Sequence, residues 1–138
     1  MAALTADRNG FVKTSGQVQS FKVAASTTIY KGGGVAVNAT GYAIPAADTA
    51  GIKTVGVAEE QVDNSSGSNG DLSVLCYVEG TFAFGGGGTA PTQADIGRTV
   101  VWEDDNLVTT AAAATNDIVA GKLLSIEGSD YFVQLHRD

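Results

Sequence analysis

The chain has 138 residues, 18 of them glycine and 2 proline, and its 8 Lys and Arg against 15 Asp and Glu give a formal charge of −7. A chain of this length suits one domain, which buries roughly 68% of the surface its unfolded form exposes and needs no disulfide or metal to fold. Without a basic cluster or a long apolar run, we expect neither nucleic acid nor a membrane as a partner.

Residues 1–20 are polar and small, and we interpret them as an extended N-terminal arm that precedes a β domain at 21–138. Their large apolar side chains are Leu4, Phe11, Val12 and Val18. Two alternatives remain open for this arm: an extended segment that is mobile in the free protein, or a first edge strand with a frayed end. The first ten residues show no secretion signal, so we expect synthesis in the cytoplasm.

The β domain begins with short alternating runs. Phe21, Val23 and Ala25 alternate along the chain, residues 27–30 lead into a glycine run, and Val35 and Val37 alternate again. The turn at 38–41 predicts a hairpin with 42–44, which Pro45 ends. Residues 52–58 predict another strand. The segment DNSSGSNG at 63–70 is typical of a loop.

Residues 71–84, DLSVLCYVEGTFAF, predict the central strand, because nearly every even position is apolar. Gly80 interrupts this run and indicates a bulge or a close backbone approach. Cys76 is the single cysteine, and its place in the run predicts a small buried hydrophobic side chain.

The rest of the chain predicts two more hairpins and one helical turn. Thr92 can cap a turn near residues 92–97 that Gly97 ends. Strands at 99–102 and 107–110 flank an acidic turn, and strands at 118–126 and 131–135 flank residues 127–130. We therefore predict an all-β fold: a single compact β-sandwich or barrel-like domain of about nine short strands with at most one short helical turn.

The residues of common catalytic and metal sites are missing from the sequence. His136 is the only histidine, and we interpret it as a solvated tail residue. The glycine runs at 32–34 and 85–88 lack the lysine and helix of a phosphate loop, and the acidic turn at 103–106 does not have the spacing of a calcium loop. We therefore expect no catalytic residues, no cofactor and no metal, and hence no enzyme.

Two other classes of protein remain open. Trp102, Tyr30, Tyr42 and Tyr131 could line a glycan-binding or adhesive surface, although most strand aromatics are half-buried. A carboxylate-only enzyme would need Asp104 or Glu103 to converge with Glu79 in a cleft.

The order of these features resembles the small β-rich decoration, or cement, proteins of tailed bacteriophage capsids. The resemblance covers roughly residues 21–135 and rests on GGVAVN at 33–38 followed by GYAIPA at 41–46, VGVA at 55–58 followed by VEGTF at 78–82, and TQADIGRTVVWED at 92–104 followed by LVTT at 107–110. These are packing and turn motifs.

The resemblance implies a non-enzymatic virion protein on the capsid exterior. Its partner would be the major capsid protein of the expanded shell, and the protein would be a homo-oligomer, a dimer or a trimer. A polar arm could add a strand to the exposed edge of a neighbour. We therefore expect the capsid contacts in the arm, at Leu4, Phe11, Val12 and Val18.

Overall fold

A computed structural model describes residues 3–10, 12–15 and 17–135. The described chain is all-β, as predicted, with two helical turns of three residues each. The strands are β1 (Val12–Ser15), β2 (Val18–Lys22), β3 (Thr27–Ile29), β4 (Gly34–Val37), β5 (Ala43–Pro45), β6 (Lys53–Ala58), β7 (Val62–Asn64), β8 (Ser73–Tyr77), β9 (Gly80–Gly86), β10 (Thr99–Trp102), β11 (Leu107–Thr110), β12 (Val119–Glu127) and β13 (Asp130–Leu135). The 3-10 turns are η1 (Gln93–Asp95) and η2 (Ala111–Ala113).

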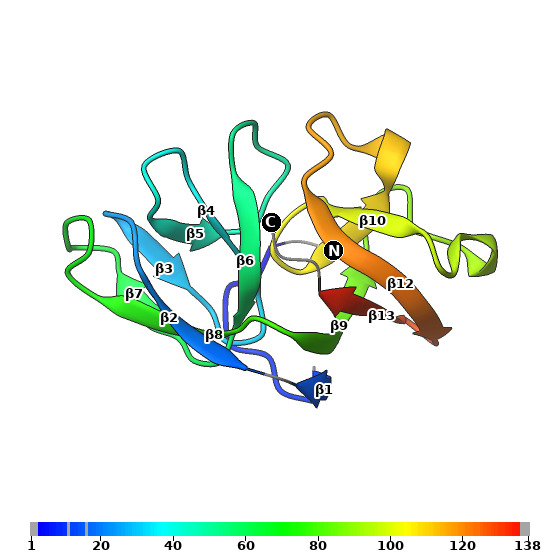
Figure 1. Ribbon diagram of the computed structural model, residues 1–138, viewed down its shortest axis with the longest axis horizontal. Helices are drawn as coiled ribbons and strands as arrows, with labels where there is room; N and C mark the ends of the chain where they lie inside the picture. The colour runs from blue at the N-terminus through cyan, green and yellow to red at the C-terminus, as the bar shows by residue number, and fades with distance from the viewer. Residues whose placement is uncertain (1–2, 11, 16, 136–138) are drawn as a thin grey trace.

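The strands form two lobes that lie side by side (Figure 1). The first lobe contains a five-stranded sheet in the order β2-β8-β6-β4-β5 and the two-stranded β3-β7 ribbon. The second lobe contains β9-β11-β10-β12-β13, and because β13 also pairs with β9, these five strands close into a barrel. Strand β1 pairs antiparallel with the first three residues of β9, Gly80–Phe82. The prediction of a barrel-like domain is therefore confirmed.

The first lobe also curls around its own core. An isolated parallel bridge joins Val23, which directly follows β2, to Ala43 of β5 at the other end of the sheet. Burial of apolar side chains inside this curl supplies the driving force for it. This core consists of Val23, Ile29, Val35, Ala43, Val55, Ala58, Val62, Val74 and Cys76.

A second core joins the two lobes. The first lobe contributes Ala36, Ala46, Ile52 and Val57, and the barrel contributes Phe82, Phe84, Val100, Trp102, Val108, Ala120, Leu123 and Val133. Because one apolar cluster draws on both lobes, they form a single packed unit.

Trp102 lies at the centre of the junction and is fully buried. Its ring meets Phe84 edge-on at a centroid distance of 4.9 Å. Its Nε1 donates to Thr54 Oγ1 at 3.0 Å, and that hydroxyl donates to Val119 O at 2.6 Å. The indole is thus held by the first lobe through Thr54 and packed by the second through Phe84.

The predicted central strand is two strands in two lobes. Residues 73–77 form β8 in the first lobe, and residues 80–86 form β9 in the barrel. The break follows from the backbone, since Val78 N–H donates to Gln17 O and Gly80 has a φ of +127° that favours glycine. Most of the predicted inward positions are buried, but Leu72 is 44% exposed.

Three further predictions need correction. The strands outnumber the predicted nine, because short pieces such as β7 form where a loop was expected and are held by one partner strand. A second helical turn, η2, forms in a run of alanines, the strongest helix formers. The predicted boundary between residues 20 and 21 falls inside β2, which pairs along its whole length with β8.

The local turns follow the sequence closely. Hairpins connect β4 to β5, β10 to β11 and β12 to β13, as predicted. At η1, the Asp95 carboxylate accepts hydrogen bonds from the N–H and the hydroxyl of Thr92, and Gly97 follows with a φ of +86°. In the described ranges no helix is long and apolar enough to cross a membrane.

Candidate functional site: a groove at the junction of the lobes

An apolar groove of about 380 Å³ opens where the two lobes meet. Its walls come from the N-terminal segment, from β3 and β5 with the residues that follow them, and from the β10–β11 turn. The lining residues are Ala3, Leu4, Thr28, Tyr30, Ile44, Pro45, Ala46, Ala47, Asp104 and Asp105. Apolar and small side chains dominate this lining, so the groove suits side chains of a protein partner better than a polar metabolite.

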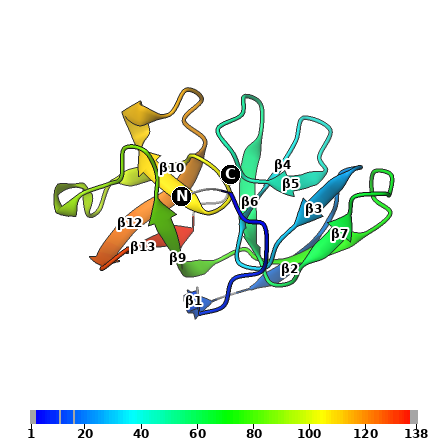
Figure 2. The same cartoon turned by 180° about the vertical axis from the view of Figure 1, so that it is seen from behind.

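The N-terminal segment, residues 3–10, runs along the junction as an irregular segment with several bends (Figure 2). Leu4 N–H donates to Asp105 Oδ1 at 3.1 Å, and Lys31 N–H donates to Asp7 Oδ1 at 3.1 Å. Arg8 N–H donates to Lys31 O at 3.0 Å. The described part of the arm is therefore bound to the body of the molecule.

Arg8 ties the segment to both lobes. Its Nη2 donates to Gly32 O of the first lobe at 2.8 Å and to Ala83 O of β9 at 2.6 Å. Its guanidinium carbon lies 5.1 Å from the ring centroid of Phe84, a cation–π distance. Burial lowers the pKa of Arg8 to about 10, although the charges of Asp105 and Asp130 raise it. Arg8 remains charged at neutral pH.

Asp105 is part of the groove wall and is only 3% exposed. Burial, and to a lesser extent the nearby charge of Asp104, raise its pKa to about 6. The hydrogen bond from Leu4 N–H and the charge of Arg8 both lower it. Neither Asp105 nor Arg8 was singled out from the sequence, where they are 97 positions apart and belong to an exposed-looking turn and a polar arm.

The structure places the predicted contact residues on different elements. Leu4 is half-buried and lines the groove. Val18 is 44% exposed on β2, opposite Tyr77 of β8. Val12 begins β1 and pairs with Phe82 of β9. Phe11 and His136 lie outside the described residues. Of the three predicted contact residues that the structure describes, Leu4 alone lines the groove.

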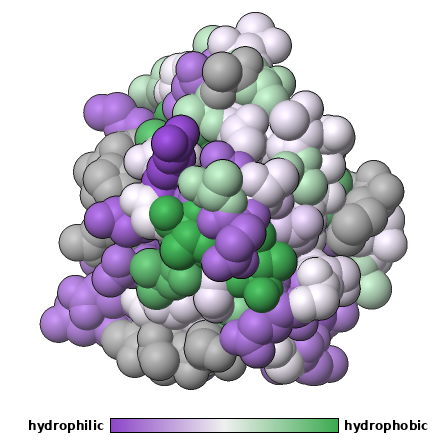
Figure 3. All heavy atoms as spheres, turned by 90° about the vertical axis from the view of Figure 1, so that its right-hand side faces the viewer, coloured by the Kyte–Doolittle hydropathy of each residue, from purple (hydrophilic) through white to green (hydrophobic). Residues whose placement is uncertain are grey.

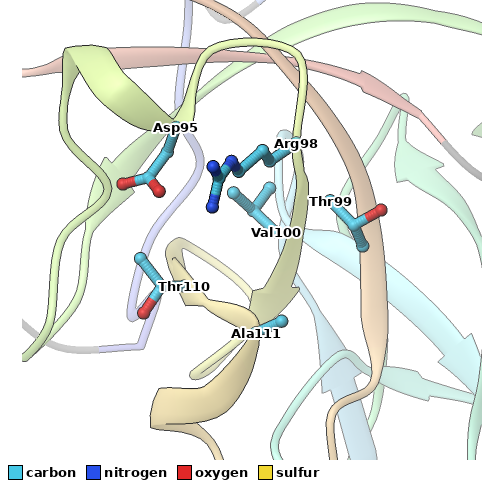
Figure 4. A pocket seen from close by; sticks show the side chains of 6 residues that line it. All are labelled: Asp95, Arg98, Thr99, Val100, Thr110 and Ala111. Carbon is cyan, nitrogen blue, oxygen red and sulfur yellow. The ribbon is translucent and has the colours of Figure 1, made fainter.

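A second hollow of about 370 Å³ lies on the barrel beside η1 and is more polar. In Figure 4 the side chain of Arg98 points toward Asp95, and Thr110 lies below both at the hollow. Arg98 is exposed, and the Asp95 carboxylate is already used by Thr92. This hollow is an open surface notch whose carboxylate has a structural partner.

The carboxylates near the acidic turn have structural partners as well. Glu103 Oε1 accepts from Gly88 N–H at 2.7 Å, and Asp104 Oδ1 accepts from the N–H groups of Asn106 and Leu107, each at 2.9 Å. Within residues 3–10, 12–15 and 17–135, no group of three His, Cys, Asp or Glu side chains is placed to hold a metal ion.

The candidate glycan-binding aromatic residues are spread over the molecule. Trp102 is buried at the junction, and Tyr30 lines the groove. Tyr42 lies in the β4–β5 turn, and Tyr131 is half-buried in β13. The end of the barrel does carry an apolar area enclosed by polar side chains (Figure 3). On this lobe the exposed large apolar side chain is Leu124 of β12, 41% exposed.

Comparison of the chain with protein-family models, with curated proteins and with solved structures gives no match. The candidate site is therefore interpreted from its own geometry.

Proposed function

We propose that this protein is a non-enzymatic decoration protein that binds the outer surface of an expanded phage capsid and stabilises it. Its partner is the major capsid protein, and it acts as an oligomer of two or three copies on the virion exterior. The apolar groove at the junction of the lobes carries this proposal, because it offers an apolar contact surface next to a tethered N-terminal segment.

The sequence pieces behind the resemblance support it. Residues 33–46 form β4 and β5, residues 55–58 lie in β6, and residues 92–110 form η1, β10 and β11. These elements supply Ala36, Val57 and Trp102 to the core shared by the two lobes. The resemblance thus falls on the residues that make the junction rigid.

A decoration protein stabilises a shell by linkage, since it binds the assembled shell more tightly than separate subunits. An oligomer that touches several subunits gains avidity through effective concentration, so each single contact needs only modest affinity. A rigid body favours this arrangement because little ordering entropy is lost on binding. The acidic surface also keeps an abundant protein soluble.

The experiment compares binding to expanded shells stripped of the protein with binding to unexpanded shells. A groove variant, Ala47→Glu, places a charge on the half-buried groove wall, and Ala50→Glu places the same charge on an exposed position of the same connector. We expect Ala47→Glu to weaken shell binding at least tenfold and Ala50→Glu to bind like the wild type, since burying an unpaired charge costs several kcal/mol.

Sedimentation of shells with bound protein measures the affinity, and the temperature at which the shells burst measures their stability. Wild-type protein that fails to bind expanded shells, or that binds without raising the burst temperature, contradicts the proposal. Equal shell binding by Ala47→Glu and Ala50→Glu would show that the groove is not the contact surface for the shell. Binding to a glycan array without shell binding would favour the adhesive alternative.

A further inference from the structure

The first lobe has an open β-edge at β2. Gln17 O accepts from Val78 N–H, and Val23 N–H donates to Leu72 O. In this register the backbone N–H and C=O groups of the odd-numbered residues of β2 point toward β8. By alternation, the N–H and C=O groups of Val18 and Ser20 point away from the sheet. Among the described residues, no hydrogen bond reaches these outward groups.

Residues 17–21 of this edge lack the features that usually prevent strand addition, and the strand β2 itself ends in Lys22. Residues 17–21, QVQSF, contain no proline and no charge, and the β2–β8 register contains no bulge. Residues 17–20 are all exposed. Next to the edge, Val18 is 44% exposed and Leu75 of β8 is 39% exposed. Such an edge is a template for another strand.

We propose that β2 pairs antiparallel with β2 of a second copy of this chain, around a two-fold axis at Gln19. In this register Val18 lies opposite Ser20 of the other copy, and the two residues exchange both backbone hydrogen bonds, four in all for the dimer. The register uses the outward groups of Val18 and Ser20 alone.

The side chains are complementary in the same register. Ser20 pairs with Leu75 within one copy, so the small serine lies between Leu75 and the incoming Val18. Val18 then contacts Ser20 of the partner copy, on the face where that copy also exposes Leu75. The two-fold axis repeats this contact, which makes the interface isologous and closed at two copies.

The lack of charge in residues 17–21 permits contact between two like-charged copies. Each chain carries a formal charge of −7, yet the pairing segment is uncharged. Two copies therefore repel over most of their surface and approach best through β2. Salt screens this repulsion, so the dimer should strengthen as ionic strength rises, whereas binding to a basic strand would weaken.

The test is the mass of the purified full chain by sedimentation equilibrium, across micromolar concentrations at low and high salt. We expect the mass to approach twice the 14.0 kDa of the monomer, at lower protein concentration when salt is high. Hydrogen exchange should show the amides of Val18 and Ser20 protected only at concentrations where the dimer forms. A monomer at every concentration, or a trimer, overturns the proposal.

Two variant pairs locate the interface. Ser20→Pro removes an outward N–H but no hydrogen bond to β8, so we expect this variant to be a monomer. Ser20→Ala keeps that N–H, so we expect it to form the dimer. Val18→Lys should also be monomeric, and Leu124→Lys, a similarly exposed site on β12, should dimerise. Dimers that survive Val18→Lys overturn the proposal even if Ser20→Pro fails to fold. Neither result depends on shell binding, which is measured separately.

Discussion

Gly34 lies directly against the Trp102 ring at the junction of the lobes. A Cβ atom built on Gly34 would lie 2.5 Å from the Trp102 ring, well inside any real contact. The ring is fixed by Phe84 on one side and by its hydrogen bond to Thr54, so it has no free direction in which to move. Glycine at position 34 is thus required by packing.

Gly34→Ala should lower the free energy of unfolding by about 1–3 kcal/mol, the usual cost of overpacking a core. Gly88→Ala is the matched control, because a Cβ there makes only an ordinary 3.5 Å contact with Glu103. We expect the control to change stability by less than about 0.5 kcal/mol. Urea unfolding measures both, and equal losses would contradict the assignment of Gly34 to the junction.

Asp105 gives stability a distinctive pH dependence. Its pKa is about 6 in the folded protein against 3.8 for an ordinary carboxyl, so the folded state binds a proton more tightly. The contribution of this group is therefore complete below pH 3.8 and declines as the pH rises through about 6. Because a tenfold difference in proton affinity corresponds to about 1.4 kcal/mol, this contribution to the free energy of unfolding is at most about 3 kcal/mol.

Asp105→Asn should remove this decline, because the amide stays neutral. We expect the stability difference, variant minus wild type, to rise with pH between the two pKa values and to level off above them. Urea unfolding across that range measures the difference, and subtraction cancels carboxylates such as Asp48, whose pKa is lowered by the N–H groups of Thr115 and Asn116. A difference that does not change with pH would show that Asp105 is not a buried acid.

At the scale of elements, the N-terminal segment acts as a tie between the lobes through Arg8. Its guanidinium reaches Gly32 O and Ala83 O with the geometry of a planar fork, which a lysine ammonium lacks. The segment therefore contributes to the stability of the body and also shapes the groove.

Arg8→Lys should cost about 2–3 kcal/mol, since hydrogen bonds to charged groups contribute roughly 1.5–3 kcal/mol each. Arg98→Lys changes an exposed arginine and should cost less than about 0.5 kcal/mol. Thermal and urea unfolding give both values. If the two variants were equally stable, Arg8 would not tie the lobes together.

The turns could be predicted from the sequence because their chemistry is local. Asn38 Oδ1 accepts from the N–H groups of Thr40 and Tyr42, and Gly41 supplies a φ of +88°. Gly128 does the same for the last hairpin with a φ of +65°. Each of these signals lies within the few residues that form the turn.

The division into lobes could not be predicted in this way. The alternation of residues 71–84 continues across the break between β8 and β9, because both strands contribute even-numbered apolar side chains to a core, although the two cores differ. The groove was missed for a related reason. Leu4 and Asp105, 101 residues apart, meet only through the tertiary structure.

At the scale of the whole molecule, the shared core predicts cooperative unfolding. Trp102 is the only tryptophan and lies where both lobes pack. Unfolding of either lobe therefore exposes the Trp102 indole to water and changes its fluorescence. Far-ultraviolet circular dichroism reports the strand content of both lobes.

We expect the urea transitions followed by Trp102 fluorescence and by circular dichroism to coincide, with one midpoint. The wild-type protein is measured by both probes in the same samples, at a concentration below that of dimer formation. Two separated midpoints would mean that the lobes unfold independently and that the junction is a weak contact between domains.

The closure of the barrel by β13 also bears on how the protein is made. Residues 81–84 of β9 pair with residues 131–134 of β13. During translation β9 therefore has no partner on this side until β13 has been synthesised, about fifty residues later. While the ribosome adds the intervening residues, β9 has an unsatisfied flank that can join other nascent chains. Ribosome pausing within this interval should therefore favour aggregation more than pausing before β9.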